Sequence, residues 1–156
     1  MTSATVHASA VLVGARAVLI RGPSGSGKSR LALQLIEAAR SGSLAFARLV
    51  GDDRVHLRAA GGRLLVRSVA ALGGLVEVRG VGLLRLPHER SAVVCLVVDL
   101  GADTERLPDA QQRQVVIEGI SLPRLAVADG TRALPAVLAM LTYSREALAG
   151  PDPQLV

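Results

Sequence analysis

The chain has 156 residues, half of them apolar, and a formal net charge of +5. This length predicts one domain over residues 1–156, and the charge suits an acidic or phosphorylated partner. One Phe, one Tyr and no Trp argue against nucleic-acid binding, and the lone Cys95 argues against disulfides. Because no apolar run reaches about 18 residues and no signal-peptide pattern occurs, we expect a soluble, cytoplasmic protein with no membrane segment.

The first predicted element is a β-hairpin. Its two β-rich stretches flank a Gly-Ala pair at residues 14–15, which suits a two-residue type II′ turn. Counting back from this turn pairs Val11 with Val18 and places His7 across from Gly22. A slip of one residue would turn His7 to the opposite face, where a structural role is the alternative.

The next stretch fits the phosphate-binding P-loop pattern G-x-x-x-x-G-K-[ST]. It consists of Gly22, Pro23, Ser24, Gly25, Ser26, Gly27, Lys28 and Ser29. An apolar run at residues 17–20 predicts a buried strand before it, and residues 30–40 have helical apolar spacing. The glycines let backbone N–H groups converge on one anion, and the helix directs its positive end at the same phosphates.

Lys28 is the only lysine among 18 basic residues. A compact ammonium suits a site near the β- and γ-phosphates better than a planar guanidinium does. The hydroxyl of Ser29 stands where P-loops ligate Mg²⁺. We therefore predict ATP and Mg²⁺ as ligands; the alternative is a chance match in a loop rich in Gly and Ser.

The whole pattern predicts an α/β fold. Predicted strands cover residues 5–13, 16–21, 45–50, 54–58, 63–66, 75–79, 83–86, 92–100, 115–117 and 124–127, and predicted helices cover residues 30–40 and 135–148. The polar residues 101–114 predict an exposed loop. Because strands and helices do not alternate as regular βαβ units, a partly antiparallel, mixed sheet is favoured over a doubly wound one.

Two adjacent acids, Asp52 and Asp53, end the apolar strand that follows the P-loop helix, as a Walker B carboxylate does. Neighbouring side chains at a strand end point in different directions. One carboxylate could therefore join a metal shell while the other takes a proton from a hydroxyl group. The alternative is a solvated turn, in which Asp is also common.

A second acidic motif is Glu77-Val78-Arg79-Gly80. On a strand, Glu77 and Arg79 share one face while Val78 points to the core. The carboxylate suits Mg²⁺ and the guanidinium suits a phosphate. The alternative is a surface ion pair on an exposed strand.

The order of these motifs resembles one enzyme family. A histidine-bearing strand precedes the strings GPSGSGKS, LVGDDRV and LVEVRGVGLL, of which the third is the most specific. From residues 7 to 84 the chain resembles the catalytic domain of HPr kinase/phosphorylase, a bifunctional enzyme acting on a serine of the phosphocarrier protein HPr. The resemblance implies a P-loop fold similar to the nucleotide-binding part of phosphoenolpyruvate carboxykinase, and a homo-oligomer that is commonly a hexamer.

The resemblance also implies roles for individual residues. His7 and Lys28 would be active-site residues at the phosphate, and Ser29 and Glu77 would bind Mg²⁺. Asp53 would be the base that deprotonates the HPr serine and the acid in the reverse reaction. The family takes its phosphate from ATP, and in many members from pyrophosphate, and removes it with inorganic phosphate.

The chain departs from the family pattern at three points, one of which is that the segment after Leu86 is short and lacks the expected Gly and aromatic content. The family's usual N-terminal domain has no counterpart, which indicates a short, catalytic-domain form. Ala110 aligns where the family has an arginine, for which Arg106 and Arg113 are the candidate substitutes. We therefore predict a serine kinase of HPr, with phosphorylase activity less strongly supported, and carry two alternatives: a small-molecule P-loop kinase and a non-catalytic nucleotide-binding regulator.

Overall fold

The computed structural model describes residues 4–103 and 107–143. Its strands are β1 (Thr5–Val13), β2 (Arg16–Arg21), β3 (Ala47–Gly51), β4 (Arg54–Ala60), β5 (Arg63–Ser68), β6 (Leu75–Val78), β7 (Gly82–Arg85), β8 (Ser91–Leu100), β9 (Gln114–Ile117) and β10 (Ile120–Val127). Its helices are α1 (Lys28–Arg40) and α2 (Ala133–Tyr143), and two short 3-10 turns are η1 (Ala70–Leu72) and η2 (Gly130–Arg132). Within these described ranges, no helix is long and apolar enough to cross a bilayer.

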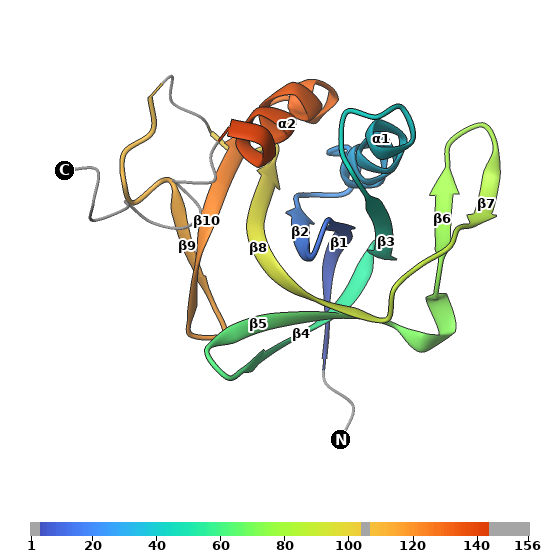
Figure 1. Cartoon of the computed structure of the whole chain (residues 1–156), viewed down its shortest axis with the longest axis horizontal. Coiled ribbons are helices and arrows are strands. Elements are labelled where there is room, and N and C mark those ends of the chain that lie inside the picture. Colours follow the sequence, from blue (N-terminus) through green and yellow to red (C-terminus); the bar gives the residue numbers. More distant parts are fainter. Residues whose placement is uncertain (1–3, 104–106, 144–156) are drawn as a thin grey trace.

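Eight strands form one mixed sheet in the order β2-β1-β4-β5-β8-β10-β9, with β3 paired to β1. β2 also pairs in parallel with β8, which closes β2, β1, β4, β5 and β8 into a ring. β8 and β10 are parallel as well, whereas the other pairs are antiparallel. The predicted mixed α/β sheet is therefore confirmed. β6 and β7 form a separate hairpin at the edge of the molecule, beside α1 (Figure 1).

Both helices lie over one face of the sheet, where they bury an aliphatic core (Figure 1). Leu31 of α1 and Val137 of α2 belong to the same buried cluster as Ile20 and Val98 of the sheet. A second buried cluster, which includes Leu19, is built mostly from strands of the ring, with Val50 of β3 and Leu122 of β10. Because successive strand residues point to opposite faces, β2 contributes to both cores and is fixed from both sides just before the P-loop.

The β1–β2 hairpin has the predicted register, with Val11 opposite Val18. Gly14 has a φ of 63°, and Ala15 is not among the residues with positive φ. A type II′ turn requires this combination, because only its first central residue is left-handed. The turn therefore sets which residues of β1 reach the end of β2.

The expected pairing of His7 with Gly22 is wrong. The β1–β2 ladder ends with Ala8 opposite Arg21, because the chain leaves the sheet at Gly22 to enter the P-loop. β1 continues instead along β4, where His7 lies opposite Arg54. His7 thus reaches the phosphate end of the molecule through a different neighbour.

Other boundaries shift by a few residues. α1 begins at Lys28, two residues earlier than predicted, because Gly27 takes a φ of 103° as its N-cap. Arg79 falls in the turn after β6 and not on the strand, so it does not share a strand face with Glu77. The end of the second predicted helix, residues 144–148, lies outside the described residues.

Candidate active site

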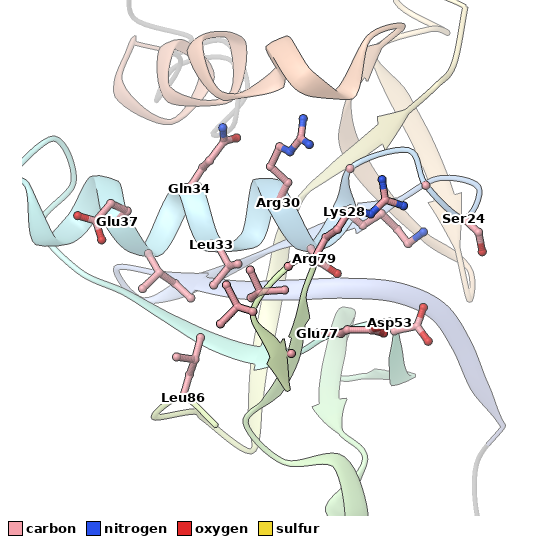
Figure 2. A pocket seen from close by; sticks show the side chains of 18 of the residues that line it. Ser24, Lys28, Arg30, Leu33, Gln34, Glu37, Asp53, Glu77, Arg79 and Leu86 are labelled. Carbon is pink, nitrogen blue, oxygen red and sulfur yellow. The ribbon is translucent and has the colours of Figure 1, made fainter. Parts of the chain in front are cut away.

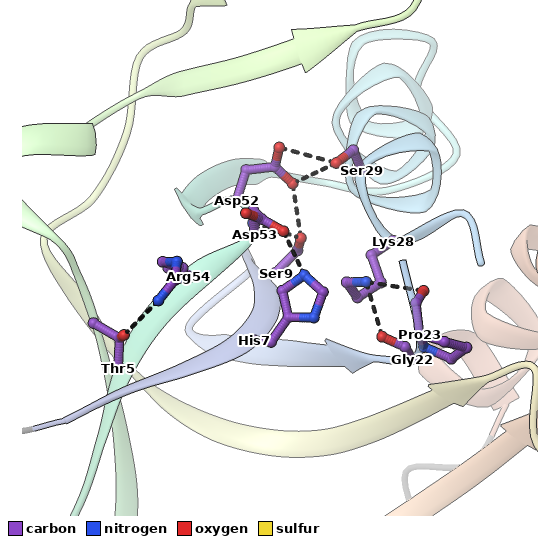
Figure 3. Close-up of polar contacts among 10 residues, drawn as sticks. All are labelled: Thr5, His7, Ser9, Gly22, Pro23, Lys28, Ser29, Asp52, Asp53 and Arg54. Carbon is purple, nitrogen blue, oxygen red and sulfur yellow. Dashed lines mark hydrogen bonds and ion pairs between the residues drawn. The ribbon is translucent and has the colours of Figure 1, made fainter. Parts of the chain in front are cut away.

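The P-loop connects the end of β2 to the N-terminus of α1. A Cβ at Gly22 would lie 2.8 Å from the carbonyl oxygen of Leu100 and 2.5 Å from Ser26 Oγ, so only glycine fits there. Lys28 is 6% exposed, and its Nζ donates to the carbonyl oxygens of Gly22 (2.8 Å) and Pro23 (3.2 Å) (Figure 3). The ammonium is therefore fixed beside the helix N-terminus, where backbone N–H groups favour an anion.

Asp52 lies against the start of α1. Ser29 Oγ donates to its two carboxylate oxygens at 2.8 and 2.9 Å, and Ser9 Oγ donates to one of them at 2.7 Å. Ser9 is fully buried in β1, and its hydroxyl also accepts from the backbone N–H of Asp53 at 3.2 Å. Ser9 therefore orients both acids, a role that the sequence analysis missed. The available signal was a hydroxyl two residues after His7, on the same face of the strand.

Asp53 occupies a strained backbone position with a φ of 66°. Its carboxylate contacts Nε2 of His7 at 2.5 Å, and its carbonyl oxygen accepts from the N–H of Ala8 at 3.1 Å (Figure 3). The side chains of His7 and Asp53 are 45% and 63% exposed, so both can contact a substrate. β1 thus brings a histidine onto the second acid of the pair.

A pocket of about 1160 Å³ lies between α1, the end of β1 and the β6–β7 hairpin. Its P-loop wall includes Ser24, Gly25, Gly27, Lys28 and Ser29, and its other walls include His7, Asp53, Glu77 and Arg79. In Figure 2, Glu77 extends from β6 toward the side that holds Asp53, and Arg79 extends toward the P-loop. The pocket is large enough for a nucleotide and remains open to a second substrate.

A family model of the HPr serine kinase C-terminal domain matches residues 1–128. The chain belongs to this family. It is 35% identical to the HPr kinase/phosphorylase of Geobacillus thermodenitrificans (strain NG80-2) over 137 residues, which cover 78% of this chain and 41% of that relative. It is 36% identical to the enzyme of Azoarcus sp. (strain BH72) over 124 residues, which cover 70% of this chain and 37% of that relative. The chain spans about two fifths of the length of these curated relatives.

A solved structure supports the same fold. The Hpr(Ser) kinase/phosphatase from Coxiella burnetii superimposes with a TM-score of 0.75 at 23% sequence identity, covering 95% of this chain and 100% of that chain. The described elements therefore form the fold of the family's C-terminal domain.

The oxygen-bearing side chains at this site suit a Mg²⁺ ion that is shared with substrate phosphates better than a metal ion held by protein side chains alone. Among the described residues, no three His, Cys, Asp or Glu side chains gather into a metal site. Ser29 and Glu77 line the pocket, whereas Asp52 is not among the lining residues and reaches the start of α1 through its hydrogen bonds with the Ser29 hydroxyl. Mg²⁺ in nucleotide sites keeps several waters and uses one or two carboxylates plus substrate phosphates, which this donor set matches.

The remaining predicted residues have different positions. Gly22 and Pro23 hold Lys28 through their carbonyl oxygens, and Ser26 Oγ is buried without a hydrogen-bond partner among the described residues. Arg113 does not line the pocket, and its Nε donates to the carbonyl oxygen of its own loop at Asp109. Arg106 lies outside the described residues. Within the described chain, the polar segment therefore brings no arginine into the pocket.

Proposed function

We propose that this chain is an ATP- and Mg²⁺-dependent kinase that phosphorylates a serine of the phosphocarrier protein HPr. The observation that carries this proposal is the His7–Asp53 contact in the same pocket as Lys28. A carboxylate oriented by a histidine, across from an ammonium and a helix N-terminus, suits phosphoryl transfer to a hydroxyl group. HPr is the proposed acceptor because the curated relatives are HPr kinase/phosphorylases.

Asp53 acts as the base in the proposed reaction. It accepts the proton of the serine hydroxyl as the serine oxygen bonds to the γ-phosphorus. The bond from that phosphorus to the β–γ bridging oxygen breaks, and ADP leaves with the electron pair. His7 orients the Asp53 carboxylate through their contact. Asp53 contacts His7 whereas Asp52 is held by Ser9 and Ser29, so the two acids take separate roles.

The phosphates are held by groups on both sides of the pocket. Lys28 and the N–H groups at the start of α1 bind the β- and γ-phosphates, and Arg79 adds a guanidinium from the hairpin. Ser29, Asp52 and Glu77 would hold Mg²⁺. When bound, the ion neutralises charge on the phosphate oxygens during transfer.

Phosphorolysis is a second proposed activity, because it is the reverse of phosphorylation with pyrophosphate as the donor, for which the same residues serve. An oxygen of inorganic phosphate bonds to the phosphorus of phosphoserine as the bond from that phosphorus to the serine oxygen breaks, protonated Asp53 gives its proton to the serine oxygen, and pyrophosphate is released. Since Ala110 stands where the resemblance places a family arginine, we expect phosphorolysis to be slower than phosphorylation. From family membership we also infer a cytoplasmic homo-oligomer, a hexamer by resemblance, and kinship with the nucleotide-binding part of phosphoenolpyruvate carboxykinase.

The test is to incubate the pure protein with ATP, Mg²⁺ and HPr from the same cell, and to locate phosphate by mass spectrometry. We expect one phosphate on one serine, and none when that serine is replaced by alanine. A panel of small hydroxyl compounds with labelled ATP is the parallel arm. Phosphate on a small compound alone would favour a small-molecule kinase. Tight ATP binding with no transfer to either acceptor would favour a non-catalytic regulator.

A further inference from the structure

A charged cluster lies behind the P-loop, outside the pocket. Asp99 is near the end of β8, between the neighbouring strands β2 and β10. Arg21 of β2 donates to both of its carboxylate oxygens, from Nε at 2.7 Å and from a terminal nitrogen at 2.9 Å. Arg124 of β10 donates to the same carboxylate from Nε at 2.5 Å. One acid therefore links three adjacent parallel strands.

The Asp99 carboxylate is well enclosed, with its side chain 13% exposed against 34% for Arg21 and 22% for Arg124. Burial raises the pKa of the Asp99 carboxyl, but the hydrogen bonds and charges of the two arginines outweigh burial and lower this pKa overall. Bidentate pairing with a guanidinium also fixes direction, because both partners are planar. Asp99 thus holds Arg21 in one orientation.

Arg21 is the last residue of β2 and is followed directly by Gly22. It pairs in register with Asp99, and Gly22 packs on the carbonyl oxygen of Leu100, the next residue of β8. The carbonyl oxygen of Gly22 accepts the hydrogen bond from Lys28 Nζ at 2.8 Å. A continuous set of contacts therefore runs from the Asp99 carboxylate to the ammonium of the phosphate site.

We propose that Asp99 is a positioning residue for the phosphate site, which acts through Arg21 to fix Gly22 and thereby Lys28. Asp99 also binds Arg124, whose guanidinium donates to the carbonyl oxygen of Gln112 at 3.1 Å. The cluster therefore also contacts the polar segment of residues 101–114. Asp99 does not line the pocket, so its effect is on the geometry of the P-loop. The inference rests on the proposed binding of ATP to the P-loop, and it deepens that proposal.

The test compares Asp99→Asn with Glu89→Gln. The control removes the Arg48–Glu89 ion pair, which has a distance of 3.0 Å and lies outside the pocket lining. We expect Asp99→Asn to weaken Mg²⁺·ATP binding by about tenfold or more, as when a partner that orients a ligand-binding group is lost. The KM for HPr should stay within about twofold of the wild-type value, and Glu89→Gln should bind ATP as the wild type does. Without ATP, amide hydrogen exchange at residues 22–27 should be faster than in the wild type for Asp99→Asn but not for Glu89→Gln.

A double variant separates positioning from stability. Asp99→Asn leaves Arg21 and Arg124 without their shared carboxylate, and adding Arg21→Gln removes one of the two charges and restores the net charge of the cluster. We expect the double variant to regain thermal stability but not ATP affinity. If affinity returned together with stability, or if Asp99→Asn bound ATP as well as or better than the wild type, the inference would be wrong. A wild-type protein that bound no ATP would contradict the proposed function, whereas normal wild-type binding with an unchanged Asp99→Asn would contradict this inference alone.

Discussion

The walls of the pocket and the support behind it come from different parts of the chain. All described lining residues lie between His7 and Leu86. Asp99 of β8 contacts the strand before the P-loop, Gly130 of η2 lies against the P-loop itself, and Arg124 of β10 contacts Asp99. The walls are built from short motifs, but Arg21 and Asp99 meet across 78 positions. The difference teaches that local sequence supplies the groups that touch phosphate, while distant residues fix where those groups point.

The largest effect should follow a change in the pocket wall. Lys28→Ala removes the ammonium held at the phosphate site, and we expect transfer from ATP to fall by on the order of 10²–10³-fold or more. The measurement is the initial rate of HPr phosphorylation. Arg90→Ala, which removes an exposed cation outside the pocket, is the control and should leave the rate unchanged. Equal losses of phosphorylation rate in the two variants would show that the rate depends on the net charge of the protein and not on the position of Lys28.

A second wall residue tests the metal. Glu77→Gln keeps the shape of the side chain but removes a charge that faces the pocket. We expect the Mg²⁺ concentration for half-maximal activity to rise by about 10- to 100-fold. Glu118→Gln changes an exposed acid in the β9–β10 turn, outside the pocket lining, and should not shift the Mg²⁺ dependence. An unchanged Mg²⁺ titration in Glu77→Gln would remove this residue from the metal site.

The support region is tested by a steric change. A Cβ at Gly130 would lie 1.8 Å from the carbonyl oxygen of Ser26, so Gly130→Ala forces η2 away from the P-loop. We expect a loss of about 1–3 kcal/mol in the free energy of unfolding, measured by urea denaturation. Gly73→Ala is the control, because its Cβ meets only the end of the His88 ring, at 2.7 Å, and that side chain can move. Similar losses in both variants would argue against tight packing of η2 on the P-loop.

The smallest expected effect is the acid dependence of stability. Because the folded-state pKa of Asp99 is lowered, its contribution to stability is complete above the ordinary value of 3.8 and is lost as the pH falls below it, toward the lower folded pKa. The difference in unfolding free energy between wild type and Asp99→Asn should therefore be constant near neutral pH and shrink below about pH 4. A difference that stayed constant down to about pH 2 would contradict the ionised triplet.

The motifs that line the pocket could be predicted from the sequence, but not every strand pairing that positions them. The P-loop and the two acids follow strands and a helix at fixed spacing, so residues 22–29 and Asp52–Asp53 were recognisable from their order alone. The hairpin turn at Gly14 gave the register of β1 and β2. The partner of His7 was missed because the β1–β2 ladder stops at Ala8 while β4 pairs with the other edge of β1, and no local pattern marks where the first ladder ends.

The support region could not be predicted for a related reason. Arg21 looked like an ordinary strand-end arginine, and Asp99 like the polar end of an apolar strand. They meet because β2 and β8 pair in parallel, a long-range pairing that closes the ring of strands. The role of Ser9 was missed for the same reason, because its two partners lie 43 and 44 positions away in the sequence. Residues whose roles depend on sheet closure carry little signal in their own neighbourhood.

The most direct measurement of the central claim compares transfer with binding in Asp53→Asn. The substitution keeps the size of the side chain but removes the base, so the protein should still bind Mg²⁺·ATP within about threefold of wild type, while single-turnover transfer to HPr should fall by about 10²–10⁴-fold. An Asp53→Asn protein that phosphorylates HPr at close to the wild-type rate would contradict the assignment of Asp53 as the base and the shared site built around it.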